Sequence, residues 1–184
     1  MKDEAQKLVC AIDLHSNNLV LVITDYKGKK IYAKRLSNDL ELVLEELAPY
    51  SERVESVAVE STYNWCWLVD GLQEKGYCVK LVNTSKASSK NTKKYTDDFA
   101  DAEFLCELQR MNNLPTGYIY PVEERSLRDL LRRRLLFVKH RTAHILSLKC
   151  LFSRQTGKRY SISNILSYST EQLMEILGDK YCVY

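Results

Sequence analysis

The amino-acid sequence predicts an α/β protein in which a mixed β-sheet is flanked by helices and followed by a long basic helix. Three observations predict this class. Short apolar segments of strand length alternate with segments of helical periodicity over the first part of the chain. Residues 123–153 then keep helical spacing without a single Gly or Pro. Charge is also separated: residues 1–124 carry 15 Lys and Arg against 20 Asp and Glu, whereas residues 125–159 carry 11 basic residues against the single Asp129.

The composition is that of a globular chain. With 184 residues, 45% of them hydrophobic and 28% charged, the chain is long enough to bury a core, and 6 Gly and 3 Pro exclude collagen-like and low-complexity classes. Neither a signal peptide nor a membrane span can be recognised, so we expect a cytoplasmic protein. Six cysteines without a C-x-x-C pair argue against a zinc ribbon and a disulfide scaffold.

The first part of the chain is expected to form a three-stranded antiparallel meander. Leu8–Leu14 and Asn18–Asp25 are apolar segments of strand length. Tyr26-Lys27-Gly28-Lys29 is typical of a hairpin turn and leads into a third strand, Lys30–Leu36. The apolar residues that follow have helical spacing and predict a helix from Leu40 that ends near Pro49.

The next elements predict a parallel pair of strands joined by a helix. Val54–Val59 is a strand that leads to Glu60, Asn64–Lys75 has helical spacing, and Tyr77–Val82 is another strand. The polar stretch Asn83–Tyr95 is expected to be a loop, and a helix follows over Asp98–Asn112.

The resulting order β-β-β-α-β-α-β-α is that of a ribonuclease-H-like core. We therefore assign residues 1–121 to a catalytic core and residues 122–155 to one long, basic, amphipathic helix. Residues 156–184, rich in serine, are expected to form a linker and a weak helix.

Four acidic residues fall at the ends of these elements. Asp13 lies within the otherwise apolar first strand, Glu60 ends the fourth strand, and Asp98 and Asp101 open the helix after the polar loop. A single carboxylate at such a position is more often a helix cap or a solvated charge, but this topology would bring all four together. They could then hold two Mg²⁺ ions roughly 4 Å apart, the arrangement that serves phosphodiester cleavage. Asp97 is a close rival to Asp98, since spacing does not fix the register.

Three segments resemble the motifs of a known family. They are Ala11-Ile12-Asp13-Leu14-His15, residues 57–65 (VAVESTYNW) and residues 96–102 (TDDFADA). In these segments the chain resembles the DEDD transposases of bacterial and archaeal insertion sequences, relatives of the pilin-gene invertase Piv. The resemblance covers roughly residues 8–155.

This resemblance implies a RuvC-like N-terminal domain whose metal-binding and catalytic tetrad is Asp13, Glu60, Asp98 and Asp101. The D-x-x-D-A pattern of the family favours Asp98 over Asp97. The carboxylate ligands suit Mg²⁺, for which Mn²⁺ can substitute. Family members also use a structured noncoding RNA that pairs donor and target DNA. They also carry a C-terminal domain with a nucleophilic serine, which we expect to be absent from a chain that ends at Tyr184.

The long helix is the main candidate for nucleic-acid binding. Its positive charge is typical of phosphate contacts, although a solvated face of a packing helix is the ordinary alternative. Its leucine stripe fits either core packing or a helix-helix seam, and the resemblance implies the start of a coiled coil that assembles dimers or tetramers and contacts RNA. The candidate residues are Arg125, Arg128, Arg132, Arg133, Arg134, Lys139, Arg141 and Lys149.

Two further groups lie near the acidic residues. Four lysines of the polar loop could clamp a nucleic-acid backbone, or they could face solvent without a partner; they are Lys86, Lys90, Lys93 and Lys94. Tyr63, Trp65 and Trp67 could stack on a base, but the helical spacing of Trp67 favours the core.

The leading hypothesis is the N-terminal RuvC-like domain of a DEDD transposase that binds DNA and guide RNA and supports Mg²⁺-dependent strand cleavage and exchange. One alternative is a stand-alone Mg²⁺-dependent nuclease, similar to a junction resolvase, that uses the same carboxylates. Another is a nucleic-acid-binding protein without catalysis. An actin-like ATPase or sugar kinase would need small residues in the first turn, which His15-Ser16-Asn17-Asn18 lacks.

Overall fold

The computed structural model describes residues 7–88 and 97–178. The chain forms two compact units, Met1–Ile119 and Tyr120–Tyr184, and each is described by itself. Among the described residues, no helix combines the length and the apolar character needed to cross a membrane.

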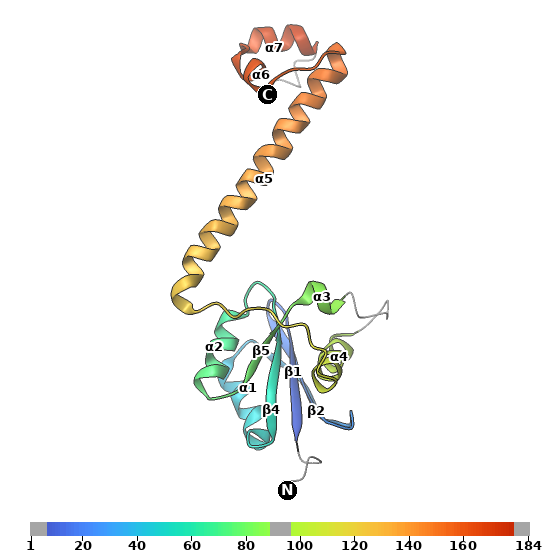
Figure 1. Cartoon of the computed structure of the whole chain (residues 1–184), viewed down its shortest axis with the longest axis vertical. Coiled ribbons are helices and arrows are strands. Elements are labelled where there is room, and N and C mark those ends of the chain that lie inside the picture. Colours follow the sequence, from blue (N-terminus) through green and yellow to red (C-terminus); the bar gives the residue numbers. More distant parts are fainter. Residues whose placement is uncertain (1–6, 89–96, 179–184) are drawn as a thin grey trace. The chain divides into compact units, whose positions relative to one another are not determined.

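The first unit is built on a five-stranded mixed sheet (Figure 1). β1 (Leu8–Leu14), β2 (Asn18–Asp25) and β3 (Lys30–Ser37) are antiparallel neighbours, whereas β4 (Val54–Glu60) and β5 (Val79–Val82) continue the sheet in parallel from β1. The strand order is β3-β2-β1-β4-β5. This order and these directions confirm the predicted ribonuclease-H-like sheet. The predicted hairpin turn is also confirmed, with Gly28 at a φ of +84° that favours glycine.

Helices cover both faces of the sheet. α1 (Leu40–Leu47) and α2 (Cys66–Glu74) lie on one face, and α4 (Asp98–Arg110) lies on the other (Figure 1). All seven residues of β1 are therefore buried, as expected for a central strand that is apolar on both sides. A short 3₁₀ turn, Ala48–Tyr50, follows α1 where the sequence predicted the helix to end.

The two faces are filled by different residues of the same strands, because successive side chains point to opposite faces. Leu8, Cys10, Ile12 and Leu14 belong to the apolar cluster under α1 and α2. Val9 and Ala11 belong to the cluster under α4, together with Ala58 of β4.

α4 is fixed across the sheet by polar as well as apolar contacts. The buried side chain of Gln109 donates hydrogen bonds to the carbonyl oxygens of Cys10 in β1, at 3.2 Å, and Ser56 in β4, at 3.1 Å. Because both acceptors lie on adjacent strands, these bonds set the position of α4 relative to the strands that carry Asp13 and Glu60.

The predicted loop after β5 contains a short helix, α3 (Thr84–Ser88). The Asn83 side chain accepts a hydrogen bond from the Lys86 backbone N–H at 3.2 Å, and Ala87 is buried under α4. The polar composition of this stretch hid the one buried alanine that anchors the helix, and so the loop prediction was wrong for these residues.

The second unit consists of α5 (Val122–Thr156) followed by α6 (Ile162–Ser167) and α7 (Thr170–Leu177). The predicted long helix is confirmed, and it ends at Gly157, whose φ is +70°. The serine-rich segment predicted as a linker contains α6, whose Ile165 packs on Phe152 in a small apolar cluster. Most side chains of α5 before this cluster are exposed.

Candidate functional site

The carboxylates of Asp13 and Glu60 reach the same face of the sheet by strand geometry. Asp13 follows Val9 and Ala11 at intervals of two, and these two residues face α4. Glu60 follows Ala58 in β4 at the same interval. Since side chains two residues apart in a strand share a face, both carboxylates face α4 at the carboxyl ends of adjacent parallel strands.

The other two acidic residues come from the first turn of α4. The side chain of Asp97 accepts a hydrogen bond from the Ala100 N–H at 2.7 Å and caps the helix. Asp98 and Asp101 are both in the first turn that follows. Of the two rival aspartates, therefore, Asp97 has a capping role and Asp98 is the one that the structure brings toward Asp13.

His15 links Asp13 to Asp98. Its Nε2 atom lies 3.2 Å from Asp13 Oδ2 and 3.3 Å from Asp98 Oδ1. One ligand atom from each of the three residues lies within 4.8 Å of the others, so that together they could hold a metal ion. His15 Nε2 is buried between the two carboxylates and makes no hydrogen bond of good geometry to either of them.

The backbone of His15 is held from two directions. The side-chain amides of Asn38 and Asn64 both donate to its carbonyl oxygen, at 3.0 and 3.1 Å. Thr62 in turn donates to Asn64 Oδ1 at 2.8 Å. These bonds connect the turn after β1 to the segment after β4, and so they position the imidazole beside the carboxylates.

Glu60 occupies the most perturbed electrostatic position of the group. Burial, a hydrogen bond to Asp13, and the negative charges of Asp13 and Asp101 together raise its pKa from 4.5 to about 8. Without a bound cation, this raised pKa favours the protonated form of Glu60 and its hydrogen bond to Asp13, whose side chain is 4% exposed. A carboxyl group whose pKa is raised by burial and by acidic neighbours indicates a site that holds more negative charge than it can stabilise alone.

Asp98 is stabilised as an anion. The guanidinium of Arg35 in β3 donates to Asp98 Oδ2 at 2.6 Å, and this hydrogen bond is the main reason that the pKa of Asp98 is lowered; the charge of His15 contributes further. Arg35 also donates to Asn18 Oδ1 at 2.9 Å and lies over the ring of Phe99. A basic residue of the meander thus neutralises one side of the acidic site.

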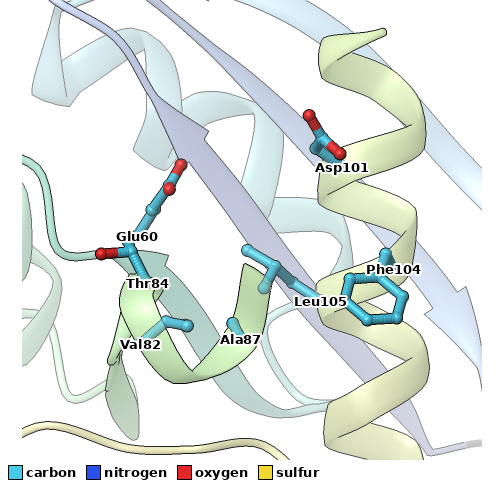
Figure 2. A pocket seen from close by; sticks show the side chains of 7 residues that line it. All are labelled: Glu60, Val82, Thr84, Ala87, Asp101, Phe104 and Leu105. Carbon is cyan, nitrogen blue, oxygen red and sulfur yellow. The ribbon is translucent and has the colours of Figure 1, made fainter. Parts of the chain in front are cut away.

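A cavity of about 200 Å³ adjoins Glu60 and Asp101. Figure 2 shows these two carboxylates at one end, with residues of β5, α3 and α4 around the remainder. The described residues that line it are Glu60, Val82, Thr84, Ala87, Asp101, Phe104 and Leu105.

The aromatic residues after β4 have separate positions. Trp65 is buried in the core under α1 and α2, and Trp67 packs against the same core. The suggestion that Trp65 could stack on a base was therefore wrong, because the turn before α2 directs it inward, while the core assignment of Trp67 is confirmed. Tyr63 is 82% exposed and is the one of these three available to a ligand.

The predicted basic residues are only partly described. Lys86 is exposed on α3, whereas Lys90, Lys93 and Lys94 lie outside the described residues. On α5, Arg125 donates to the Tyr120 carbonyl oxygen at 2.8 Å, and Arg128 pairs with Asp129 and lies over the Tyr120 ring. Lys149 is half-buried, and the remaining candidates are exposed along the helix; they are Arg132, Arg133, Arg134, Lys139 and Arg141.

Sequence reasoning did not nominate His15 and Arg35. For His15 a signal was present, because it directly follows the first strand, two positions after Asp13. For Arg35 there was none: its approach to Asp98 joins residues 63 positions apart.

Comparisons with known proteins give a family match and weaker structural similarities. The family model of the IS110-type DEDD transposases, described as "Transposase", matches residues 10–154. RuvC of T. thermophilus, solved in complex with a Holliday junction substrate, is 17% identical, with a TM-score of 0.45 over 60% of this chain and 99% of that chain. The ethanolamine utilization protein EutJ from Carboxydothermus hydrogenoformans is 16% identical, with a TM-score of 0.34 over 45% of this chain and 39% of that chain.

No curated protein matches the sequence. The family match includes most of β1, all of β4 and α4, and nearly all of α5, and it therefore contains Asp13, Glu60, Asp98 and Asp101. On this match, the chain belongs to the DEDD transposase family.

Proposed function

We propose that this chain is the RuvC-like, nucleic-acid-binding part of a DEDD transposase that supports Mg²⁺-dependent cleavage and exchange of DNA strands. The observation that carries the proposal is that Asp13 and Asp98 lie with His15 close enough to hold a metal ion, while Glu60 is hydrogen-bonded to Asp13 and lines one cavity with Asp101. Carboxylates that lie this close together destabilise the folded chain unless a cation or a proton offsets their negative charge.

The donor set fits a divalent cation. Four carboxylates offer the oxygen ligands that Mg²⁺ and Mn²⁺ prefer, and we assign Asp13, Glu60, Asp98 and Asp101 as the metal ligands and catalytic residues. The unsatisfied Nε2 of His15 adds one nitrogen donor, which suits Mn²⁺ better than Mg²⁺. The chemistry that a bound divalent cation supplies at such a site is polarisation of a phosphodiester and activation of the attacking oxygen.

The residues of the chain prepare the site for this chemistry. Glu60 must lose the proton that it shares with Asp13 before both carboxylates can act as ligands. Arg35 holds one oxygen of Asp98 and leaves the other directed to His15 and Asp13. The two amides that hold the His15 carbonyl keep the imidazole in place while charge at the site changes.

Nucleic-acid binding is assigned to the basic side chains of α3 and α5, most of which are exposed. Arginine forks suit phosphate oxygens, and scattered exposed charges bind them without sequence preference. We propose that DNA and a structured guide RNA contact the described residues Lys86, Arg125, Arg128, Arg132, Arg133, Arg134, Lys139, Arg141 and Lys149, and we extend the proposal to Lys90, Lys93 and Lys94 on their sequence alone.

We further propose that α5 joins two or more copies of the chain. Its apolar side chains remain largely exposed over several turns, for example Leu130 at 65% and Phe137 at 61%, and exposed apolar patches of this kind mark interaction surfaces. Replacing Leu130, Phe137 and Leu148 by Gln should shift the chain from oligomer to monomer in sedimentation velocity. A wild-type chain that sediments as a monomer at high concentration would refute this part.

Metal binding tests the central proposal. Titration of the metal-free chain with Mn²⁺, followed by electron paramagnetic resonance, should show bound Mn²⁺, and Mg²⁺ should displace it. Asp13→Asn should lose most of this binding, whereas Glu74→Gln, an exposed residue at the end of α2, should retain it. His15→Gln should weaken Mn²⁺ binding more than Mg²⁺ binding. Equal binding by wild type and Asp13→Asn would overturn the assignment.

A further inference from the structure

The cavity beside Glu60 and Asp101 has two chemically different ends (Figure 2). Its polar end is formed by these two carboxylates. The remainder is formed by apolar side chains of β5, α3 and α4, with the Thr84 hydroxyl and the half-buried ring of Phe104 among them. None of the seven described lining residues is basic, so the interior does not suit a phosphate group.

The cavity lies next to the carboxylates at which a reacting phosphate would bind. Glu60 lines the cavity and is also hydrogen-bonded to Asp13. A phosphodiester bound at the carboxylates would therefore have its neighbouring nucleotide at the mouth of the cavity. Of the parts of a nucleotide, only the base has apolar faces together with a hydrogen-bonding edge that could meet Thr84.

The size of the cavity points to the same occupant. Pockets that enclose a whole drug-sized ligand measure about 300–1,000 Å³, and this cavity measures about 200 Å³. It has room for one flat ring system and not for a complete nucleotide. Enzymes that do chemistry on a base take it out of the stack into a pocket, at the lowest cost where the base is already unpaired.

We propose that the cavity receives the unstacked base of a nucleotide next to the scissile phosphate. This inference rests on the proposed function, because it requires a nucleic acid at the carboxylates. It specifies the substrate further: branched or locally melted DNA is favoured over continuous duplex, since a paired base cannot enter the cavity without the cost of unstacking.

The test uses branched DNA in which 2-aminopurine, a base analogue whose fluorescence rises on unstacking, replaces one nucleotide at a time around the branch. Ca²⁺ takes the place of Mg²⁺ to allow binding without turnover. With the wild-type chain, fluorescence should rise at one position. Ala87→Met fills the cavity and should abolish this rise and weaken binding of branched DNA at least about fivefold. Ser85→Met adds the same bulk at an exposed neighbour on α3 and should change neither.

Phe104→Ala provides a second variant, because Ala87 is buried and its replacement could impair folding. It removes one wall without adding bulk and should lower the fluorescence rise by at least half. The base-binding inference is refuted, and the proposed function is not, by either of two results. One is that the wild-type chain binds branched DNA and 2-aminopurine fluorescence rises at no position; the other is that both cavity variants retain the fluorescence rise. If the wild-type chain binds no DNA, the proposed function fails with it.

Discussion

The carboxyl end of the sheet and the helix α5 carry opposite charges in opposite surroundings. In the first unit the acidic residues are brought together by tertiary structure, which also sets their ionisation: burial and the neighbouring Asp13 and Asp101 raise the pKa of Glu60 to about 8, whereas Arg35 and His15 lower that of Asp98. On α5 the basic residues are mostly exposed and spaced along one helix. The difference teaches that replacing one acidic residue should affect the others, because they are neighbours. The exposed basic residues should instead make small, additive contributions to nucleic-acid binding that salt screens.

The largest expected effect follows from removing one member of the acidic unit. Asp13→Asn should lower the rate of strand cleavage in branched DNA by at least about 100-fold in Mg²⁺, because metal chemistry supplies several kcal/mol of transition-state stabilisation. Gel assays of labelled DNA give the rate, and binding of the same DNA should stay within about threefold. Glu74→Gln serves as the control. If Asp13→Asn cleaves DNA as fast as the wild-type chain, the carboxylates do not act together in cleavage.

An intermediate effect is expected from the sum of charges on α5. Replacing Arg132, Arg133 and Arg134 by Gln should weaken DNA and RNA binding by about 10- to 100-fold and reduce the slope of log affinity against log salt by about 2 to 3. Fluorescence anisotropy over a salt series measures both. A matched triple replacement of Lys27, Lys29 and Lys75, exposed on the first unit, should have a much smaller effect. Equal losses for the two triple variants would show that α5 has no special role.

A smaller effect is expected from proton binding at Glu60. Its folded-state pKa of about 8 lies above its ordinary value of 4.5, so the folded state binds this proton more tightly than the unfolded state does. The stabilisation is complete below pH 4.5 and is lost as the pH rises through about 8. The melting temperature of the metal-free chain should thus fall between about pH 6 and about pH 9, and Glu60→Gln should remove a few degrees of that fall. If the melting temperature of Glu60→Gln falls with pH as much as that of the wild-type chain, Glu60 is not the group whose proton stabilises the fold.

The smallest effect concerns the support of His15. Asn64→Ala removes one of two hydrogen bonds to its carbonyl oxygen and should reduce the free energy of unfolding by about 1 kcal/mol. Urea denaturation measures this loss, and Gln73→Ala, at an exposed position of α2, should leave stability nearly unchanged. If Asn64→Ala keeps its fold but loses affinity for Mn²⁺, then metal binding at the acidic residues also depends on the residues that hold His15 in place.

Much of the fold could be predicted from local pattern. Short-range patterns in the sequence predict the apolar strands, the glycine-containing turn and the long helix without Gly or Pro. The structure confirms each of these elements. The family resemblance is confirmed over residues 10–154. Where local pattern misled, as for α3, α6 and Trp65, a few buried contacts outweighed a polar or turn-like composition.

By itself, the sequence determined which residues could meet. Because side chains alternate along a strand and return every three or four residues on a helix, the positions of Asp13, Glu60, Asp98 and Asp101 already favoured one shared face. The tertiary structure alone decided what surrounds them: the approach of His15 and Arg35, the cap at Asp97, the proton on Glu60 and the cavity behind it. These features depend on distances and burial between residues far apart in the chain, which no local pattern encodes.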